Sequence, residues 1–142
     1  MKENAMIDQK TAPYAILLLR VTTGALFVVH GLTKLLVFTP AGTAGYFGSL
    51  GLPGWLGPLT MAIEIIGGVA LIAGFATRIV SAGFVVLLLG AAFSAHWAKG
   101  FGWTAEGGGW EYPVMWAMVQ ASIALLGDGA YAVYPSALKK AA

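Results

Sequence analysis

The chain has 142 residues, the length of one domain, and 58% of them are hydrophobic. Only 10% are charged, against roughly 25% in an ordinary soluble domain, so the composition indicates a membrane protein. The net charge of +2 includes no basic run, and we therefore expect no nucleic-acid partner. The absence of cysteine excludes thiolate chemistry and iron–sulfur ligation by this chain, and no metal site is predicted.

Four apolar segments, each near the roughly 20 residues that cross a bilayer as a helix, follow one another along the chain. They predict a single all-α domain over 1–142, a bundle of four transmembrane helices. A very short connection follows the second segment, so the second and third helices should form an antiparallel pair. The predicted helices span about 14–38, 58–77, 79–98 and 112–128.

The long first connection, 39–55, carries signals for a short helix of its own. Thr39 followed by Pro40 is typical of a helix start, and Gly51 before Pro53 is typical of a stop. We expect this helix to lie at the membrane interface. Its surface-lying apolar residues would be Tyr46, Phe47 and Leu50.

Basic residues near the helix ends predict the orientation of the chain. Six lie on the side that holds both termini: Lys2, Lys10, Arg20, Arg78, Lys139 and Lys140. Lys34 and Lys99 lie on the other side. Both termini should therefore face the cytoplasm.

Small and polar residues recur at helical spacing on the first two segments, and we expect these two stripes to face each other. The first stripe contains Arg20, Gly24, Phe27, Gly31 and Lys34. The second contains Thr60, Glu64, Gly67, Leu71, Gly74 and Arg78.

Glu64 is the most informative single residue because an acid inside a membrane helix is costly unless it is paired or functional. His30 and Lys34, one helical turn apart, should lie at a comparable depth on the first helix. We therefore predict a cluster of His30, Lys34 and Glu64, which His96 and Glu111 could close from above.

Three interpretations of this cluster remain open. It could be a buried ion pair that fixes the register of the helices. Alternatively, His30 or Lys34 could donate a hydrogen bond to a quinone carbonyl or an anion, with Glu64 relaying a proton. Metal binding by His30, His96, Glu64 and Glu111 has suitable ligand types but no compact motif.

A second polar pair is expected near the cytoplasmic side. Arg20 lies about two turns inside the first helix, and Asp128 ends the fourth. We predict a structural salt bridge between them, with extension of Arg20 toward the lipid headgroups as the alternative.

Four segments together resemble the DoxX family of small four-helix bacterial membrane proteins. They are LLLRVTTGALFVVHGLTKL, EIIGGVALIAGFATR, GGGWEYP and GDGAYAVY, and the resemblance covers roughly 14–134. The chain departs from the family pattern near its end. Ala130, Ala132 and Tyr134 stand where the family often has an arginine, a serine and a final aspartate.

The resemblance implies a multi-pass protein of the bacterial inner membrane that is linked to oxidoreductase systems, including thiosulfate:quinone oxidoreductase and quinone or catechol resistance. We therefore expect a membrane subunit of a quinone-linked oxidoreductase or of a quinone and oxidative-stress detoxification system. A quinone is the implied cofactor, and the expected partners are membrane lipid, soluble or membrane oxidoreductase subunits, and further copies of the chain. The alternatives are a noncatalytic scaffold for soluble oxidoreductases and a component of a small-solute permease.

Overall fold

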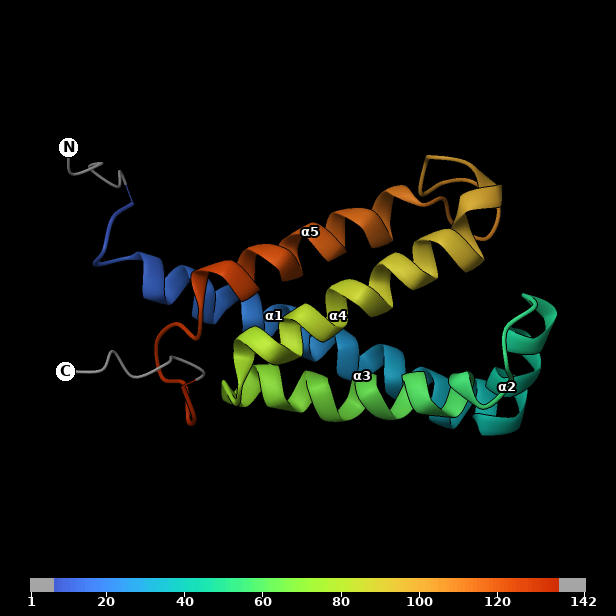
Figure 1. Ribbon diagram of the computed structural model, residues 1–142, viewed down its shortest axis with the longest axis horizontal. Helices are drawn as coiled ribbons and strands as arrows, with labels where there is room; N and C mark the ends of the chain where they lie inside the picture. The colour runs from blue at the N-terminus through green and yellow to red at the C-terminus, as the bar shows by residue number, and fades with distance from the viewer. Residues whose placement is uncertain (1–6, 136–142) are drawn as a thin grey trace.

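The computed structural model describes residues 7–135, and within this range the chain is helical, with no β-strand (Figure 1). Two helices are interrupted or extended by π-helical turns, which are named η1 and η2. The elements in order are α1 (Ala12–Thr33), η1 (Lys34–Phe38), α2 (Thr39–Ser49), α3 (Leu56–Ala73), α4 (Thr77–Ala91), η2 (Ala92–His96), the 3₁₀ turn η3 (Trp97–Lys99) and α5 (Glu111–Leu126).

The long helices form two hairpins. α1 packs chiefly on α3, and α4 packs chiefly on α5. Figure 1 shows the hairpins close together where α3 joins α4, which we call the closed end. They diverge toward α2 and the 100–110 loop, which we call the open end. The fold therefore places α2 and the 100–110 loop at the same end of the molecule.

The first hairpin is held by a close approach of two helix backbones. A Cβ atom on Gly68 of α3 would lie 2.6 Å from the carbonyl oxygen of Gly24 on α1. One on Gly31 would lie 3.0 Å from the Met61 carbonyl oxygen. The two predicted stripes therefore do meet, but Gly68 replaces Gly67 at the contact. Gly67 instead packs against the ring of Phe84 on α4.

Helix α3 ends earlier than the predicted segment 58–77. Gly74 adopts a left-handed conformation with φ of 76°, which glycine tolerates and other residues rarely do. The amides of Gly74 and Phe75 both donate to the carbonyl of Ala70, at 2.9 and 2.8 Å, and close the helix end. Arg78 consequently belongs to α4, which corrects its assignment to the stripe on the second helix.

An aromatic stack joins the two hairpins. The ring of Phe27 on α1 lies 3.5 Å from that of Phe84 on α4 and 4.4 Å from that of Trp116 on α5, measured between ring centroids. Leu71, Leu88 and Ala117 complete this buried core. The core therefore contains residues from all four long helices.

Three stretches among the described residues are long and apolar enough to cross a membrane: Ala12–Ser49, Leu56–Ala73 and Thr77–Lys99. The first bends at Thr39, whose φ of 65° is unusual for a β-branched residue, so α2 leaves the direction of α1. The fourth predicted segment, 112–128, overlaps α5 (Glu111–Leu126), whose 16 residues are fewer than the roughly 20 of a typical span.

The glycine contact gives a stability prediction. Gly68→Ala places a methyl group against the Gly24 carbonyl and should lower the free energy of unfolding by about 1–3 kcal/mol, because α1 and α3 must separate. Gly83→Ala is the matched control, since a Cβ on Gly83 meets nothing within 4 Å. Thermal unfolding in detergent, followed by circular dichroism, measures both. A Gly68→Ala protein that melts at or above Gly83→Ala would contradict the close approach.

Candidate functional site

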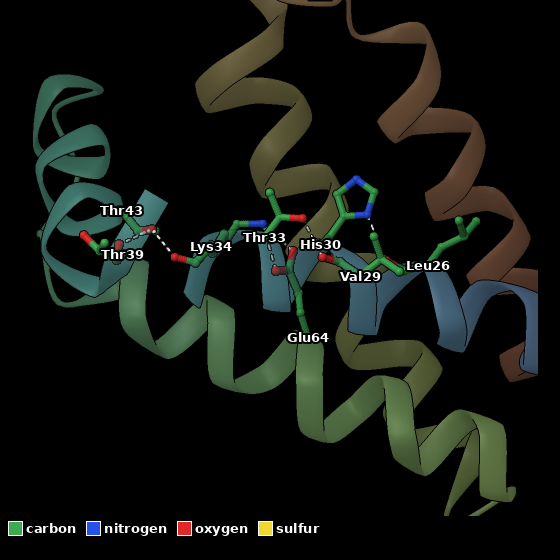
Figure 2. Close-up of polar contacts among 8 residues, drawn as sticks. All are labelled: Leu26, Val29, His30, Thr33, Lys34, Thr39, Thr43 and Glu64. Carbon is green, nitrogen blue, oxygen red and sulfur yellow. Dashed lines mark hydrogen bonds and ion pairs between the residues drawn. The ribbon is translucent and has the colours of Figure 1, made fainter. Parts of the chain in front are cut away.

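An ion pair connects α3 to the end of α1. The Lys34 ammonium group donates to both carboxylate oxygens of Glu64, at 2.8 and 3.0 Å (Figure 2). The Glu64 side chain is 7% exposed and that of Lys34 is 21% exposed. The structure therefore brings together the two oppositely charged residues that the sequence places in apolar helices.

A π-helical turn and a hydroxyl network position Lys34. Lys34 is the first residue of η1, where the backbone leaves regular α-helical geometry. The Thr43 hydroxyl donates to the Thr39 carbonyl at 2.9 Å and approaches the Lys34 carbonyl at 3.4 Å. The Thr39 hydroxyl accepts a hydrogen bond from the Gly42 amide at 3.2 Å, which helps start α2. Such π-helical turns are frequent at functional sites.

His30 lies one turn before Lys34, and a main-chain carbonyl determines which of its ring nitrogens carries a proton. Its Nδ1 atom lies 2.8 Å from the Leu26 carbonyl, which can only accept, so Nδ1 must carry a proton. Nε2 is therefore an acceptor in the neutral ring and a donor in the imidazolium. In Figure 2 the ring stands out from α1 on the side away from α3. Its edge approaches Trp116, with 5.2 Å between ring centroids.

His96 has the same arrangement in the second hairpin. It ends η2, and its Nδ1 lies 2.8 Å from the Gly108 carbonyl in the 100–110 loop. The Lys99 ammonium group donates to the neighbouring Gly107 carbonyl at 3.2 Å. His96 and Lys99 thus tie the 100–110 loop to η2 and η3, which follow α4. As in His30, Nε2 of His96 accepts a hydrogen bond when the ring is neutral and donates one when the ring is protonated.

Glu111 takes a different role from the predicted one. Its carboxylate accepts a hydrogen bond from the Trp103 amide at 3.2 Å, so it fastens the 100–110 loop at the start of α5. Glu111 does not line the cavity beside the ion pair. The structure thus brings His30, Lys34, Glu64 and His96 to one cavity, and leaves Glu111 outside it.

A cavity of about 610 Å³, the outer cavity, opens beside the ion pair between the two hairpins. Its polar lining is His30, Lys34, Glu64 and His96, and its aromatic lining is Trp103, Tyr112 and Trp116. The remaining lining residues are Leu87, Leu88, Ala91, Gly108, Gly109 and Pro113. A mostly apolar cavity with a few convergent polar groups is the usual form of a small-molecule site.

A second cavity of about 510 Å³, the side cavity, also contacts the ion pair. It lies among α2, α3 and α4, and Tyr46, Phe47 and Leu50 line it. It shares five residues with the outer cavity: Lys34, Glu64, Leu87, Ala91 and His96. The ion pair therefore stands where two cavities meet.

The sequence did not identify the aromatic walls of the outer cavity. Trp116 is 8% exposed and lies in the second turn of α5, whereas a tryptophan at a membrane interface lies near a helix end. The position of Trp116 inside the apolar segment, away from its ends, was the feature of the sequence that indicated a buried tryptophan. On α5, Met115, Met118 and Ser122 are exposed, and the buried face carries Trp116 and Gln120.

The residues considered as metal ligands are not gathered into one group. Among residues 7–135, no three histidine, aspartate or glutamate side chains lie close enough together to hold a metal ion. His30 and His96 instead direct Nδ1 toward main-chain carbonyls, and Glu64 bonds to Lys34. These side chains are therefore engaged in hydrogen bonds with protein groups.

Arg20 is fully buried and does not reach toward the headgroups. Its guanidinium donates to the carbonyls of Leu71 and Ile72 at 3.0 and 2.9 Å, in the last turn of α3, and to that of Ala130 at 2.6 Å. Asp128 adds a favourable electrostatic interaction with this guanidinium. Arg20 therefore satisfies helix-end carbonyls and links α1, α3 and the segment after α5.

Comparison with known proteins identifies the family of the chain. A family model described as DoxX matches residues 15–97, more than half of the chain. The chain belongs to the DoxX family. This confirms the resemblance seen in the sequence, and with the apolar helices it identifies a membrane protein.

Two relatives of this DoxX protein are informative. The protein named "Putative oxidoreductase CatD" of Bacillus subtilis (strain 168) is 38% identical over 130 residues, which cover 92% of each chain. "Inner membrane protein YqjF" of Escherichia coli (strain K12) is 34% identical over 95 residues, covering 65% of this chain and 71% of the relative. No solved structure matches this chain.

The ion pair in this DoxX protein can be tested by a double-mutant cycle. Lys34→Met and Glu64→Met should each lower the free energy of unfolding by about 1–3 kcal/mol, because each leaves one charge without its partner in an apolar environment. The double variant should lose less than the sum of the two. Thermal or denaturant unfolding in detergent measures the cycle. Strictly additive losses would show that the pair contributes no coupling.

Proposed function

We propose that this DoxX protein is an integral membrane subunit that binds a quinone for an oxidoreductase or for a quinone and oxidative-stress detoxification system. The observation that carries the proposal is the outer cavity, where an ion pair and two histidines meet three aromatic side chains. The relative named "Putative oxidoreductase CatD" supports the link to redox chemistry.

The outer cavity has the chemical groups that a quinone ring needs. Trp103, Tyr112 and Trp116 offer aromatic surface to a planar ring, and Lys34 offers a charged donor for a ring carbonyl. Nε2 of His30 can accept a hydrogen bond from a hydroxyl when the ring is neutral and donate to a carbonyl when it is protonated. The same residues can therefore bind either the oxidised or the reduced ring.

The chain's own part in such a reaction is to bind the ring and to exchange protons with it. Reduction of a quinone to a quinol takes up two electrons and two protons. Glu64 and His30 can hold protons at the cavity wall, and Lys34 keeps Glu64 in position. Without cysteine, the chain cannot hold an iron–sulfur cluster on thiolates, so we assign electron transfer to a soluble or membrane oxidoreductase partner.

For topology, we propose four membrane spans, formed by α1, α3, α4 with η2, and α5, with α2 at the outer interface. Both termini then lie in the cytoplasm, and the membrane is the bacterial inner membrane. The basic residues at the closed end and the name "Inner membrane protein YqjF" support this arrangement. The 16 residues of α5 suit a span whose ends are completed by the adjoining loops.

A scaffold that recruits soluble oxidoreductases is the second candidate, and one observation favours it. The Lys34 ammonium group bonds both Glu64 oxygens, and a purely structural role in joining α1 and α3 is enough to explain this arrangement. In that case the outer cavity would hold lipid, and the protein would act through its surface and its oligomeric state.

Quinone binding distinguishes the two functions. A ubiquinone or menaquinone analogue should quench the tryptophan fluorescence of the purified protein, because Trp103 and Trp116 line the outer cavity. Glu64→Gln should weaken binding about tenfold, because it removes the charge that positions Lys34. Glu106→Gln, at an exposed loop position outside the cavity, should bind like wild type.

Two results would count against the quinone site. If the quinone analogue does not saturably quench the tryptophan fluorescence of the wild-type protein, the outer cavity binds no quinone. A Glu64→Gln protein with a lower melting temperature and unchanged quinone affinity would instead favour the scaffold.

The topology is testable because the chain has no native cysteine. Ser49→Cys and Thr104→Cys should react with a membrane-impermeant maleimide on intact spheroplasts, since α2 and the 100–110 loop lie at the open end. Thr11→Cys, before α1, should react only in inverted vesicles. Labelling of all three from the same side would exclude the proposed orientation.

A further inference from the structure

A third hollow, the α3/α4 groove, lies where the two hairpins face each other on the outside of the bundle. It measures about 570 Å³, and its lining residues are apolar or small, apart from Thr60. Gly67 and Phe84 form part of its floor, since the Phe84 ring would contact any side chain added to Gly67. Gly83 faces it from α4, and a Cβ on Gly83 would meet nothing within 4 Å.

The α3/α4 groove lies next to the hollows that contact the ion pair. It shares Leu56, Thr60, Val86 and Leu87 with the side cavity. The side cavity in turn shares the ion pair with the outer cavity, and Leu87 lines all three hollows. The three hollows therefore follow one another from the polar cluster to the apolar outer face of α3 and α4, and we call this series the ligand path.

The chemistry changes along this path. Charged and aromatic groups line its inner part, at the outer cavity. Exposed aliphatic residues such as Ile63, Ile66 and Val86 line its far part, within helices long and apolar enough to cross a membrane. A ligand that matches both parts has a polar ring at one end and a hydrocarbon chain at the other.

We propose that the α3/α4 groove binds the isoprenoid tail of a membrane quinone whose ring occupies the outer cavity. This inference rests on the proposed function and narrows it, because it selects long-tailed membrane quinones over small water-soluble quinones or catechols. The ligand then enters sideways from the lipid, between the hairpins, and its tail stays in contact with the bilayer. A groove filled from the lipid needs no opening of the 100–110 loop.

The test compares two ligands with the same ring, a benzoquinone without a tail and one with two isoprene units, on three proteins. Gly83→Leu adds an apolar side chain to the groove at a position where a Cβ meets nothing within 4 Å. Ala82→Leu adds apolar volume to the adjacent, exposed position of α4 that does not line the groove. Dissociation constants are measured by tryptophan quenching in detergent micelles, with each ligand's partitioning into empty micelles subtracted.

The expected result is selective. Gly83→Leu should weaken binding of the tailed quinone about tenfold, the order expected when a few buried methylene groups lose their site. It should change binding of the tailless quinone less than about twofold, and Ala82→Leu should leave both ligands unchanged.

Three results would overturn the inference, and they are distinguishable. If Gly83→Leu and Ala82→Leu bind the tailed quinone equally while ring binding persists, the groove holds no tail and the proposed function stands. If neither ligand binds wild-type protein, the proposed function fails together with the inference. If Gly83→Leu converts a dimer to a monomer in chemical crosslinking, the groove holds a second copy of the chain.

Discussion

Charged and hydrogen-bonding groups inside apolar helices must find partners within the protein, and this constraint organises the molecule. Glu64 and Lys34 satisfy each other across α1 and α3. Arg20 donates to the carbonyls of Leu71 and Ile72 in the last turn of α3, where a helix has fewer main-chain donors for its carbonyls. Each of these contacts joins elements far apart in the sequence, so the cost of burying charge is met by the contacts that define the first hairpin.

The second hairpin repeats part of this arrangement. Arg78, at the start of α4, donates to the carbonyls of Ala124 and Leu125 in the last turn of α5, both at 2.9 Å. Gly127 follows α5 with a positive φ and packs beside Arg78, as Gly74 follows α3 and packs beside Arg20. Each hairpin thus uses an arginine on its first helix and a glycine after its second. The ionic pair at the open end belongs to the first hairpin, and the second contributes aromatic walls.

The sequence predicted much of the helical framework because the apolar segments are long and the breaks between them contain glycine and proline. It also paired Lys34 with Glu64, since two opposite charges in apolar helices have few alternatives. Gly67 was expected at the contact with α1 in place of Gly68, because residues at spacings of three and four both fit one helix face. The main-chain partners of Glu111 and Arg20 could not be predicted, since only the folded chain brings these groups near.

Helix ends and the walls of the outer cavity were harder to predict for related reasons. The end of α3 depends on the left-handed conformation of Gly74, and a glycine in an apolar segment is equally compatible with close helix packing. Trp116 belongs to the cavity only because the two hairpins meet through Phe27 and Phe84. A helix pattern identifies an apolar face, but it does not identify which neighbour covers that face.

The short connection between α3 and α4 has a mechanical consequence. Each hairpin is internally braced, whereas the two are joined in sequence by the three residues from Gly74 to Ala76. The segment after α5 crosses this connection: the Ala76 amide donates to the Tyr134 carbonyl at 3.1 Å, and the Tyr134 amide donates to the Gly74 carbonyl at 3.2 Å. The two hairpins are therefore connected at the closed end by three residues that are hydrogen-bonded to the segment after α5. Any rotation of one hairpin against the other about this connection would displace the open end most, where the ion pair and the 100–110 loop lie.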